Sequence, residues 1–128
     1  MREIVSSPRV PKPAGPYSPA VRANGMVFVS GQIPLDPQTG ALVEGGIQAE
    51  TARVLENMKT VLEAAGLSLQ DVVKTTVFLK NLAEFGQMNE IYAKYFGANP
   101  PARSTIEVAR LPRDCRIEME AIAVDSAV

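Results

Sequence analysis

The sequence contains no histidine and only one cysteine, and these shortages exclude several kinds of active site. Without histidine there is no Ser-His-Asp or Cys-His nucleophile system and no His-ligated metal site. The lone cysteine, Cys115, can form neither an internal disulfide nor a CxxC site. The glycine patterns of a Rossmann fold or a P-loop are also missing. An enzyme built from this chain must work with Glu, Asp, Tyr, Lys, Arg, hydroxyl groups and water.

An excess of basic charge and long apolar runs are lacking as well. Thirteen Lys and Arg residues against fourteen Asp and Glu give a net charge of −1 at pH 7, so no basic excess is present to bind a nucleic-acid backbone. The longest apolar runs fall far short of the ~20 residues that a membrane span needs. Residues 1–10 lack the apolar stretch of a secretory signal. We therefore expect a cytoplasmic protein that binds neither nucleic acid nor membrane.

What is present is typical of one soluble globular domain. The chain has 128 residues, of which 46% are hydrophobic and 21% charged, and we expect residues 1–128 to form a single domain. The first 20 residues hold five prolines and are expected to form an extended arm. Asn24-Gly25 between β-prone residues predicts a hairpin of 20–22 with 26–29, whose second strand ends at Ser30-Gly31. Residues 36–40 are expected to form a turn.

Two segments have the apolar spacing of an amphipathic helix. In residues 47–65 the expected buried stripe is Ile47, Ala52, Leu55, Met58, Val61, Leu62 and Ala65. The charged residues expected on the opposite side are Glu50, Arg53, Glu56, Lys59 and Glu63. Gly66 is a natural stop. In residues 82–96 the expected core positions are Leu82, Phe85, Met88, Tyr92 and Phe96 or Tyr95.

Residues 71–80, 102–109 and 116–124 are predicted to be strands. The first is rich in β-branched residues. The order of elements predicts an α+β fold, a mixed sheet with two helices on one face, and therefore an uncovered second face. Alternation along the strands places Arg103, Thr105 and Glu107 on one side, which we take to be the uncovered one.

In the last strand the same alternation separates a helix-covered side from an uncovered side. The covered side comprises Cys115, Ile117, Met119, Ala121 and Ala123, and Cys115 is expected to be a small core residue. The uncovered side comprises Arg116, Glu118, Glu120, Ile122 and Val124. Its mixture of charges and bulky aliphatic residues suits contact with another subunit, so we expect an oligomer.

Six segments carry a resemblance to a known family. They are GPYSPA (15–20), VSGQIPLDPQTG (29–40), NMKTVLEAAG (57–66), VVKTTVFLKNL (72–82), PARSTIEVARLP (101–112) and IEMEAIA (117–123). In this order they resemble the RidA family, also called YjgF/YER057c/UK114, from about Gly15 to Val124. The last two segments at their family spacing are the most specific. The resemblance implies a chorismate-mutase-like fold and a homotrimer with three sites at the subunit clefts.

The resemblance also implies an activity in metabolite damage control. Members of this family are enamine/imine deaminases, which hydrolyse 2-aminoacrylate, 2-iminopropanoate and 2-iminobutanoate to 2-keto acids and ammonia. They use no cofactor and no metal. Their substrates leak from pyridoxal-phosphate (PLP) enzymes, so the resemblance implies a functional link to PLP-dependent dehydratases.

Two residues would carry the chemistry. Arg103 is expected to bind the substrate carboxylate, for which a planar guanidinium fork is suited. Glu118 would hold the attacking water, and its neighbour Glu120 is expected to push at least one of their two pKa values upward. From the residues alone, a surface arginine paired with Glu107 or Glu120 is the more common interpretation of Arg103. The two glutamates could likewise be charges on a solvated strand.

Other residues would line the site. The resemblance assigns Tyr17, Ser30, the Gly31 backbone and Asn89 to the pocket. Thr105 stands where many members have cysteine, and it keeps the backbone N–H that can bind a carboxylate but not the thiol. From the residues alone, Tyr17 could simply pin the arm to the core. Glu120 is expected to have no catalytic role and to pair with a basic neighbour.

Other functions stay open at this stage. The same cleft could bind a small 2-keto or amino acid without turnover, as a regulatory trimer. It could also serve another deaminase of the family, of the aminomuconate type. An endoribonuclease or translation inhibitor is disfavoured by the missing histidine and the net charge of −1. A chorismate mutase would share only the fold, and a fold does not imply a function.

Overall fold

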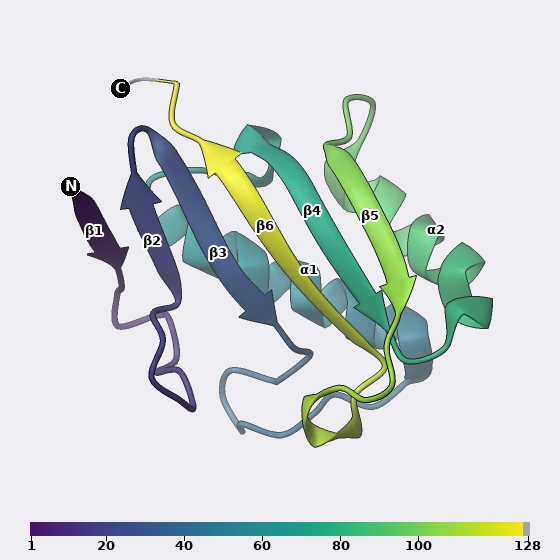
Figure 1. Cartoon of the computed structure of the whole chain (residues 1–128). Helices are drawn as coiled ribbons and strands as arrows, with labels where there is room; N and C mark the ends of the chain where they lie inside the picture. Colours follow the sequence, from purple (N-terminus) through teal and green to yellow (C-terminus); the bar gives the residue numbers. More distant parts are fainter. Residues whose placement is uncertain (127–128) are drawn as a thin grey trace.

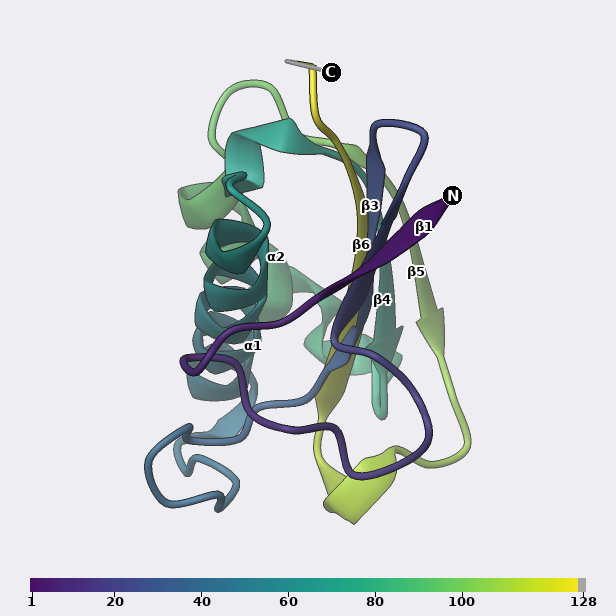
Figure 2. The same cartoon turned by 90° about the vertical axis from the view of Figure 1, so that its left-hand side faces the viewer.

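The computed structural model describes residues 1–126, which fold into a six-stranded sheet with both helices on one face (Figures 1 and 2). The strands are β1 (Arg2–Val5), β2 (Ala20–Ala23), β3 (Met26–Gln32), β4 (Val72–Leu79), β5 (Ala102–Glu107) and β6 (Ile117–Val124). The helices are α1 (Gly46–Ala64) and α2 (Phe85–Phe96). The sheet order is β1-β2-β3-β6-β4-β5. Within residues 1–126 only β4 and β5 pair in parallel, so the predicted mixed α+β sheet is confirmed.

The N-terminal part holds one strand that the sequence did not predict. The hairpin of β2 and β3 turns at Asn24 and Gly25, whose φ angles of 51° and 73° are those of the expected tight turn. β1 pairs antiparallel with β2 and forms one edge of the sheet. It lies ahead of the first proline, Pro8, so its backbone donors remain available for pairing.

The core fills the space between the helices and the sheet. Its largest fully buried side chains come from α1, α2, β3, β4 and β6 and include Leu55, Met58, Leu62, Leu79, Met88, Ile117 and Met119. The predicted covered side of β6 is confirmed, since Ile117, Met119, Ala121 and Ala123 are all buried. Cys115, just ahead of β6, is buried too, as expected of a small core residue.

Three expectations about burial were wrong. Glu50 was assigned to the solvent side of α1 but is only 8% exposed, because it pairs with Arg116 beneath the helix. Ala52, assigned to the buried stripe, is half-exposed. Leu82 and Phe85 are exposed rather than core, because α2 begins only at Phe85 after a short 3-10 turn. Met88, Tyr92 and Phe96 form the buried stripe of α2.

The second face of the sheet carries an apolar row. In register across four strands, Ile4 pairs with Val21, Val21 with Phe28, and Phe28 with Ile122. Ile4 and Phe28 are exposed, as is Ile106 at the opposite edge. Such a surface favours contact with another protein surface.

No helix within residues 1–126 combines the length and apolar character needed to cross a bilayer.

Candidate functional site

Arg103 lies on the helix-covered face of the sheet, and the expectation that it lies on the open face was wrong. Its register partner on β4 is Thr75, which is fully buried beneath the helices. Alternation showed correctly that Arg103 and Thr105 share a side. Alternation alone could not show which of the two sides faces the helices. The opposite side of β5 carries the apolar residue Ile106, but this residue is 46% exposed.

The Arg103 guanidinium sits against two aromatic rings of α2. Its Cζ atom lies 4.7 Å from the centroid of the Tyr92 ring and 5.3 Å from that of Phe85. Phe85, Asn89 and Tyr92 are spaced so that they share one face of α2. Among residues 1–126 no carboxylate lies within ion-pair distance of Arg103, so the structural alternative of a pair with Glu107 or Glu120 is not formed.

Thr105 follows Arg103 on the same side of β5. Its hydroxyl oxygen is buried and has no hydrogen-bond partner in the described part of the chain. A buried hydroxyl without a partner is costly, on the order of 1–3 kcal/mol, and is therefore uncommon. We call Asn89, Arg103 and Thr105, with the rings of Phe85 and Tyr92, the Arg103 group.

Glu118 lies on the other face, on the central strand β6. The pairing of β3 with β6 shifts register between Val29 and Gln32, so Ser30 and Gly31 form a bulge. The expectation that β3 ends at Ser30-Gly31 was therefore wrong by one residue, since the strand runs to Gln32. A Cβ atom on Gly31 would lie 2.0 Å from the Glu118 Oε2 atom, so the carboxylate lies directly against the Gly31 backbone.

Ser30 and Tyr17 connect this bulge to the N-terminal arm. The Ser30 hydroxyl donates to the Ser18 carbonyl (2.6 Å) and its N–H to the Pro19 carbonyl (3.0 Å), so the Ser30 side chain anchors the arm. Tyr17 is 55% exposed. Both residues, with Gly31, line a cavity of about 430 Å³ between the arm, the loop after β3 and α1. We call Tyr17, Ser30, Gly31 and Glu118 the Glu118 group.

The electrostatics of Glu118 agree with the expectation from its sequence neighbours. Burial raises the pKa of Glu118, and the nearby charge of Glu120 raises it further. Glu120 forms no ion pair with any of the residues 1–126, so its expected basic partner is missing. Cys115 is a poor nucleophile, because burial and the charge of Glu50 raise its thiol pKa to about 11.

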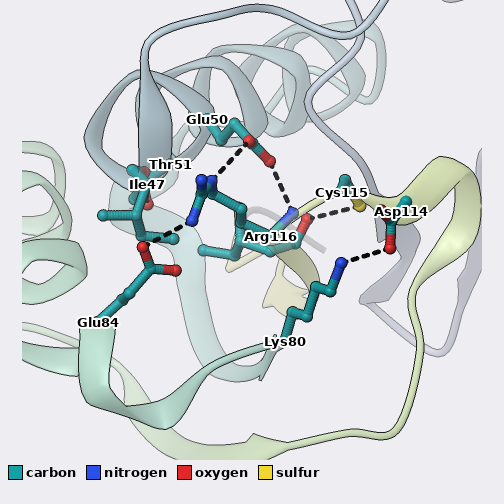
Figure 3. A network of polar contacts seen from close by, with 9 residues as sticks. Ile47, Glu50, Thr51, Lys80, Glu84, Asp114, Cys115 and Arg116 are labelled. Carbon is teal, nitrogen blue, oxygen red and sulfur yellow. Dashed lines mark hydrogen bonds and ion pairs between the residues drawn. The ribbon is translucent and has the colours of Figure 1, made fainter.

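A polar network lies at the start of β6 (Figure 3). The Arg116 backbone N–H donates to the Glu50 Oε1 atom (2.8 Å), and its guanidinium contacts Glu50 and also Glu84 (2.9 Å). Arg116 was expected on the open face but reaches α1 instead, because it precedes β6 and strand alternation does not apply to it. The network joins β6 to α1 and to the turn ahead of α2, and we interpret it as structural.

The two groups cannot meet on one ligand within one chain. Arg103 and Thr105 face the helices from the edge strand β5, whereas Glu118 faces away from them on β6, with β4 between the two strands. Figure 2 shows the sheet edge-on, with the helices to one side only. One copy of the chain therefore holds the two groups of candidate residues on opposite faces of its sheet.

Known proteins were compared with the chain in sequence and in structure. A family model described as Endoribonuclease L-PSP matches residues 8–125. A RutC family protein of Pyrococcus horikoshii is 54% identical over 96% of this chain and 98% of its own length. The 2-iminobutanoate/2-iminopropanoate deaminase of Mus musculus is 46% identical over 97% and 92%. The crystal structure of E. coli TdcF with bound serine has a TM-score of 0.90 and 44% identity, covering 97% and 99%. This chain belongs to the RidA (YjgF) family.

Sequence reasoning missed the aromatic support of Arg103. Phe85 and Tyr92 were interpreted only as core positions, and Thr75 was not singled out. A signal was present, because Phe85, Asn89 and Tyr92 have the spacing of one helix face and Asn89 was already a candidate. What the sequence could not indicate was that this face of α2 lies over Arg103.

Proposed function

We propose that this protein is a hydrolytic deaminase of reactive enamine and imine intermediates, with 2-iminopropanoate and 2-iminobutanoate as substrates and 2-keto acids and ammonia as products. The observation that carries the proposal is Arg103, a permanent cation between two rings with no carboxylate partner among residues 1–126. Such a guanidinium suits a ligand carboxylate. The identity of 46% to the mouse deaminase supports the same reaction class.

The proposed site lies between two copies of the chain in a homotrimer. The Arg103 group of one copy would face the Glu118 group of the next, because neither group can complete the site alone. The exposed apolar row with Ile4 and Phe28 supports burial of the open face between subunits. Tyr17 is exposed and lines a cavity with Ser30 and Gly31, and it would offer its hydroxyl at the same cleft.

The mechanism needs one anchor and one proton carrier. Arg103, with the Thr105 backbone N–H, holds the carboxylate and thereby fixes the adjacent C=N carbon. Glu118 accepts a proton from a water molecule as the water oxygen bonds to that carbon, and it passes the proton to the nitrogen. The carbinolamine then loses its hydroxyl proton through Glu118 to the same nitrogen, the C–N bond breaks, and ammonia and the 2-keto acid leave.

The elevated pKa of Glu118 suits this role. A carboxylate with a raised pKa is a stronger base and exchanges protons more readily near neutral pH. Tyr17 and Asn89 would orient the water and the nitrogen. Because the imine is already electrophilic, positioning with one proton carrier can supply the acceleration. Enamine substrates such as 2-aminoacrylate enter after tautomerising to the imine.

A coupled assay tests the proposal. A PLP-dependent serine or threonine dehydratase generates the enamine in situ, and the appearance of the keto acid is followed with and without this protein. Wild type should accelerate the reaction, and Arg103→Ala and Glu118→Gln should not. Lys59→Ala is the control, since it removes a cation from the exposed side of α1. Acceleration by Arg103→Ala equal to wild type would refute the assignment.

A binding role without turnover is the second candidate. It is favoured by the serine found in the E. coli TdcF structure, because serine carries the same carboxylate and nitrogen as the proposed substrates. A trimer that binds serine or 2-oxobutanoate but fails in the coupled assay would establish it. An endoribonuclease is disfavoured despite the family description, since the chain lacks histidine and carries a net charge of −1.

A further inference from the structure

Thr75, Tyr92 and Arg103 form a closed triangle of contacts beneath the edge of the sheet. Thr75 and Arg103 are register partners on β4 and β5. The Thr75 hydroxyl and the Tyr92 hydroxyl lie 2.7 Å apart, within hydrogen-bond distance, and the Tyr92 ring centroid lies 4.7 Å from the Arg103 Cζ atom. Thr75 is fully buried and Tyr92 is 5% exposed, so neighbouring side chains hold both in place.

The Phe85 ring completes this support. Tyr92 lies seven positions after Phe85, which is about 10.5 Å along a helix at 1.5 Å per residue. The Arg103 Cζ atom lies 4.7 Å and 5.3 Å from the two ring centroids, so the guanidinium occupies the gap between them. A ring attracts a cation through its face. The N–H edges of the guanidinium are the donors that bind carboxylates, and ring contacts do not use them.

We propose that Tyr92, fixed by its hydrogen bond to Thr75, is a positioning residue that holds the Arg103 guanidinium ready for a substrate carboxylate. The inference rests on the proposed function and adds to it. An arginine side chain has many rotamers, and ordering it only when the ligand arrives weakens binding. The buried Tyr92 ring orders the Arg103 side chain before the ligand arrives, so ligand binding does not include this entropic cost. Tyr92 acts through Arg103 and does not itself touch the substrate.

Binding and turnover should separate in the variants. Tyr92→Leu removes the ring and its hydroxyl, and the Kd for 2-oxobutanoate and the KM should both rise by about 5- to 30-fold. The kcat should stay nearly unchanged, because the carboxylate is bound alike in the ground state and the transition state. Thr75→Val removes the hydrogen bond between the two hydroxyls, and Tyr92→Phe also removes the hydroxyl that interacts with Arg103. Both variants keep the ring, and each should raise Kd by a smaller factor. If Tyr92→Leu does not fold, the Kd values of these two conservative variants test the inference instead.

Tyr95 offers a matched control on the same helix. Its hydroxyl donates to the Glu56 Oε2 atom of α1 (2.8 Å), and it has no ring contact with Arg103. Tyr95→Leu likewise removes a ring and a hydrogen bond from α2 to a neighbouring element, so it should lower stability without changing Kd or KM. If both tyrosine variants raise Kd equally, the effect is one of general stability and the inference is overturned.

A ligand-free measurement distinguishes this inference from the proposed function. The Arg103 Nε–Hε signal, assigned by its loss in Arg103→Lys, should be shifted upfield by the ring currents in wild type and should move toward the random-coil position in Tyr92→Leu. An unmoved signal, or an unchanged Kd, overturns the inference even when the deaminase assay succeeds. A moved signal with a raised Kd supports it even when wild type shows no turnover.

Discussion

The Glu118 carboxylate occupies the space that a side chain at Gly31 would need. A Cβ atom there would lie 2.0 Å from the Glu118 Oε2 atom and 3.0 Å from its Cδ. The backbone of Gly31 does not adopt a left-handed conformation, so glycine is required for close approach and not for its φ angle. The β3 bulge thus fixes the position of the proposed water-holding carboxylate.

Gly31→Ala should displace Glu118 while leaving the fold intact. The atoms that the new methyl group would meet belong to the flexible Glu118 side chain, which can rotate away. A displacement of about 1 Å at a reacting group can cost on the order of 100-fold in rate, and we expect a loss of that size in the coupled assay. Circular dichroism and the mass of the assembly should be unchanged.

Gly86→Ala is the matched control for that variant. Apart from its chain neighbours and the backbone of its own helix, no atom of residues 1–126 lies within 4 Å of a Cβ at this position, so alanine should raise the free energy of unfolding by about 0.5–1 kcal/mol. Deaminase turnover should stay at the wild-type level. Equal turnover in Gly31→Ala and Gly86→Ala would show that the position of Glu118 does not matter for the reaction.

Glu118→Gln should stabilise the protein at neutral pH while abolishing turnover. Burial, and then the charge of Glu120, raises the pKa of Glu118 above its ordinary value of 4.5, so the folded state binds this proton more tightly than the unfolded chain does. The free energy of unfolding of wild type should therefore fall as pH rises from 4.5 through the folded pKa. Denaturant unfolding between about pH 4 and 8 should show the gap between variant and wild type closing toward acid pH. A gap independent of pH would contradict the raised pKa.

Thr105→Val should have opposite effects on stability and on binding. It removes a buried hydroxyl that has no hydrogen-bond partner among residues 1–126, so the free energy of unfolding should rise by about 1 kcal/mol. If the hydroxyl donates to the bound carboxylate, affinity for 2-oxobutanoate should fall by about fivefold. Thermal unfolding and calorimetric titration measure the two effects, with Thr105→Ser as the control that keeps the hydroxyl. Unchanged affinity in Thr105→Val would limit the role of this residue to its backbone N–H.

Arg116→Ala should destabilise the fold without a direct effect on the reaction. It leaves the carboxylates of Glu50 and Glu84 without their shared cation, at a cost of about 1–3 kcal/mol in urea unfolding. Arg9→Ala breaks an ion pair with Glu63 between two exposed side chains and should cost less than about 0.5 kcal/mol. Equal costs for the two variants would refute the structural role of the network in Figure 3.

Local sequence patterns were reliable guides to the secondary structure. The Asn24-Gly25 turn, the apolar spacing of α1 and the β-branched run of β4 each depend on neighbouring residues, and each appears where it was predicted. β1 was missed, because four residues with no alternating pattern form a strand only when β2 lies beside them. The burial of Glu50 was missed for a similar reason, since its partner Arg116 lies 66 residues away.

The sequence by itself determined which residues have the chemistry that the proposed reaction needs. The tertiary structure decided on which face of the sheet those residues lie. The absence of histidine and the motifs around Arg103 and Glu118 are properties of the chain alone. That these two residues lie on opposite faces, with Arg103 between the rings of Phe85 and Tyr92, depends on which side of β5 the helix α2 covers. Strand alternation shows which residues share a side but not which of the two sides is covered. Only packing between distant segments could decide that.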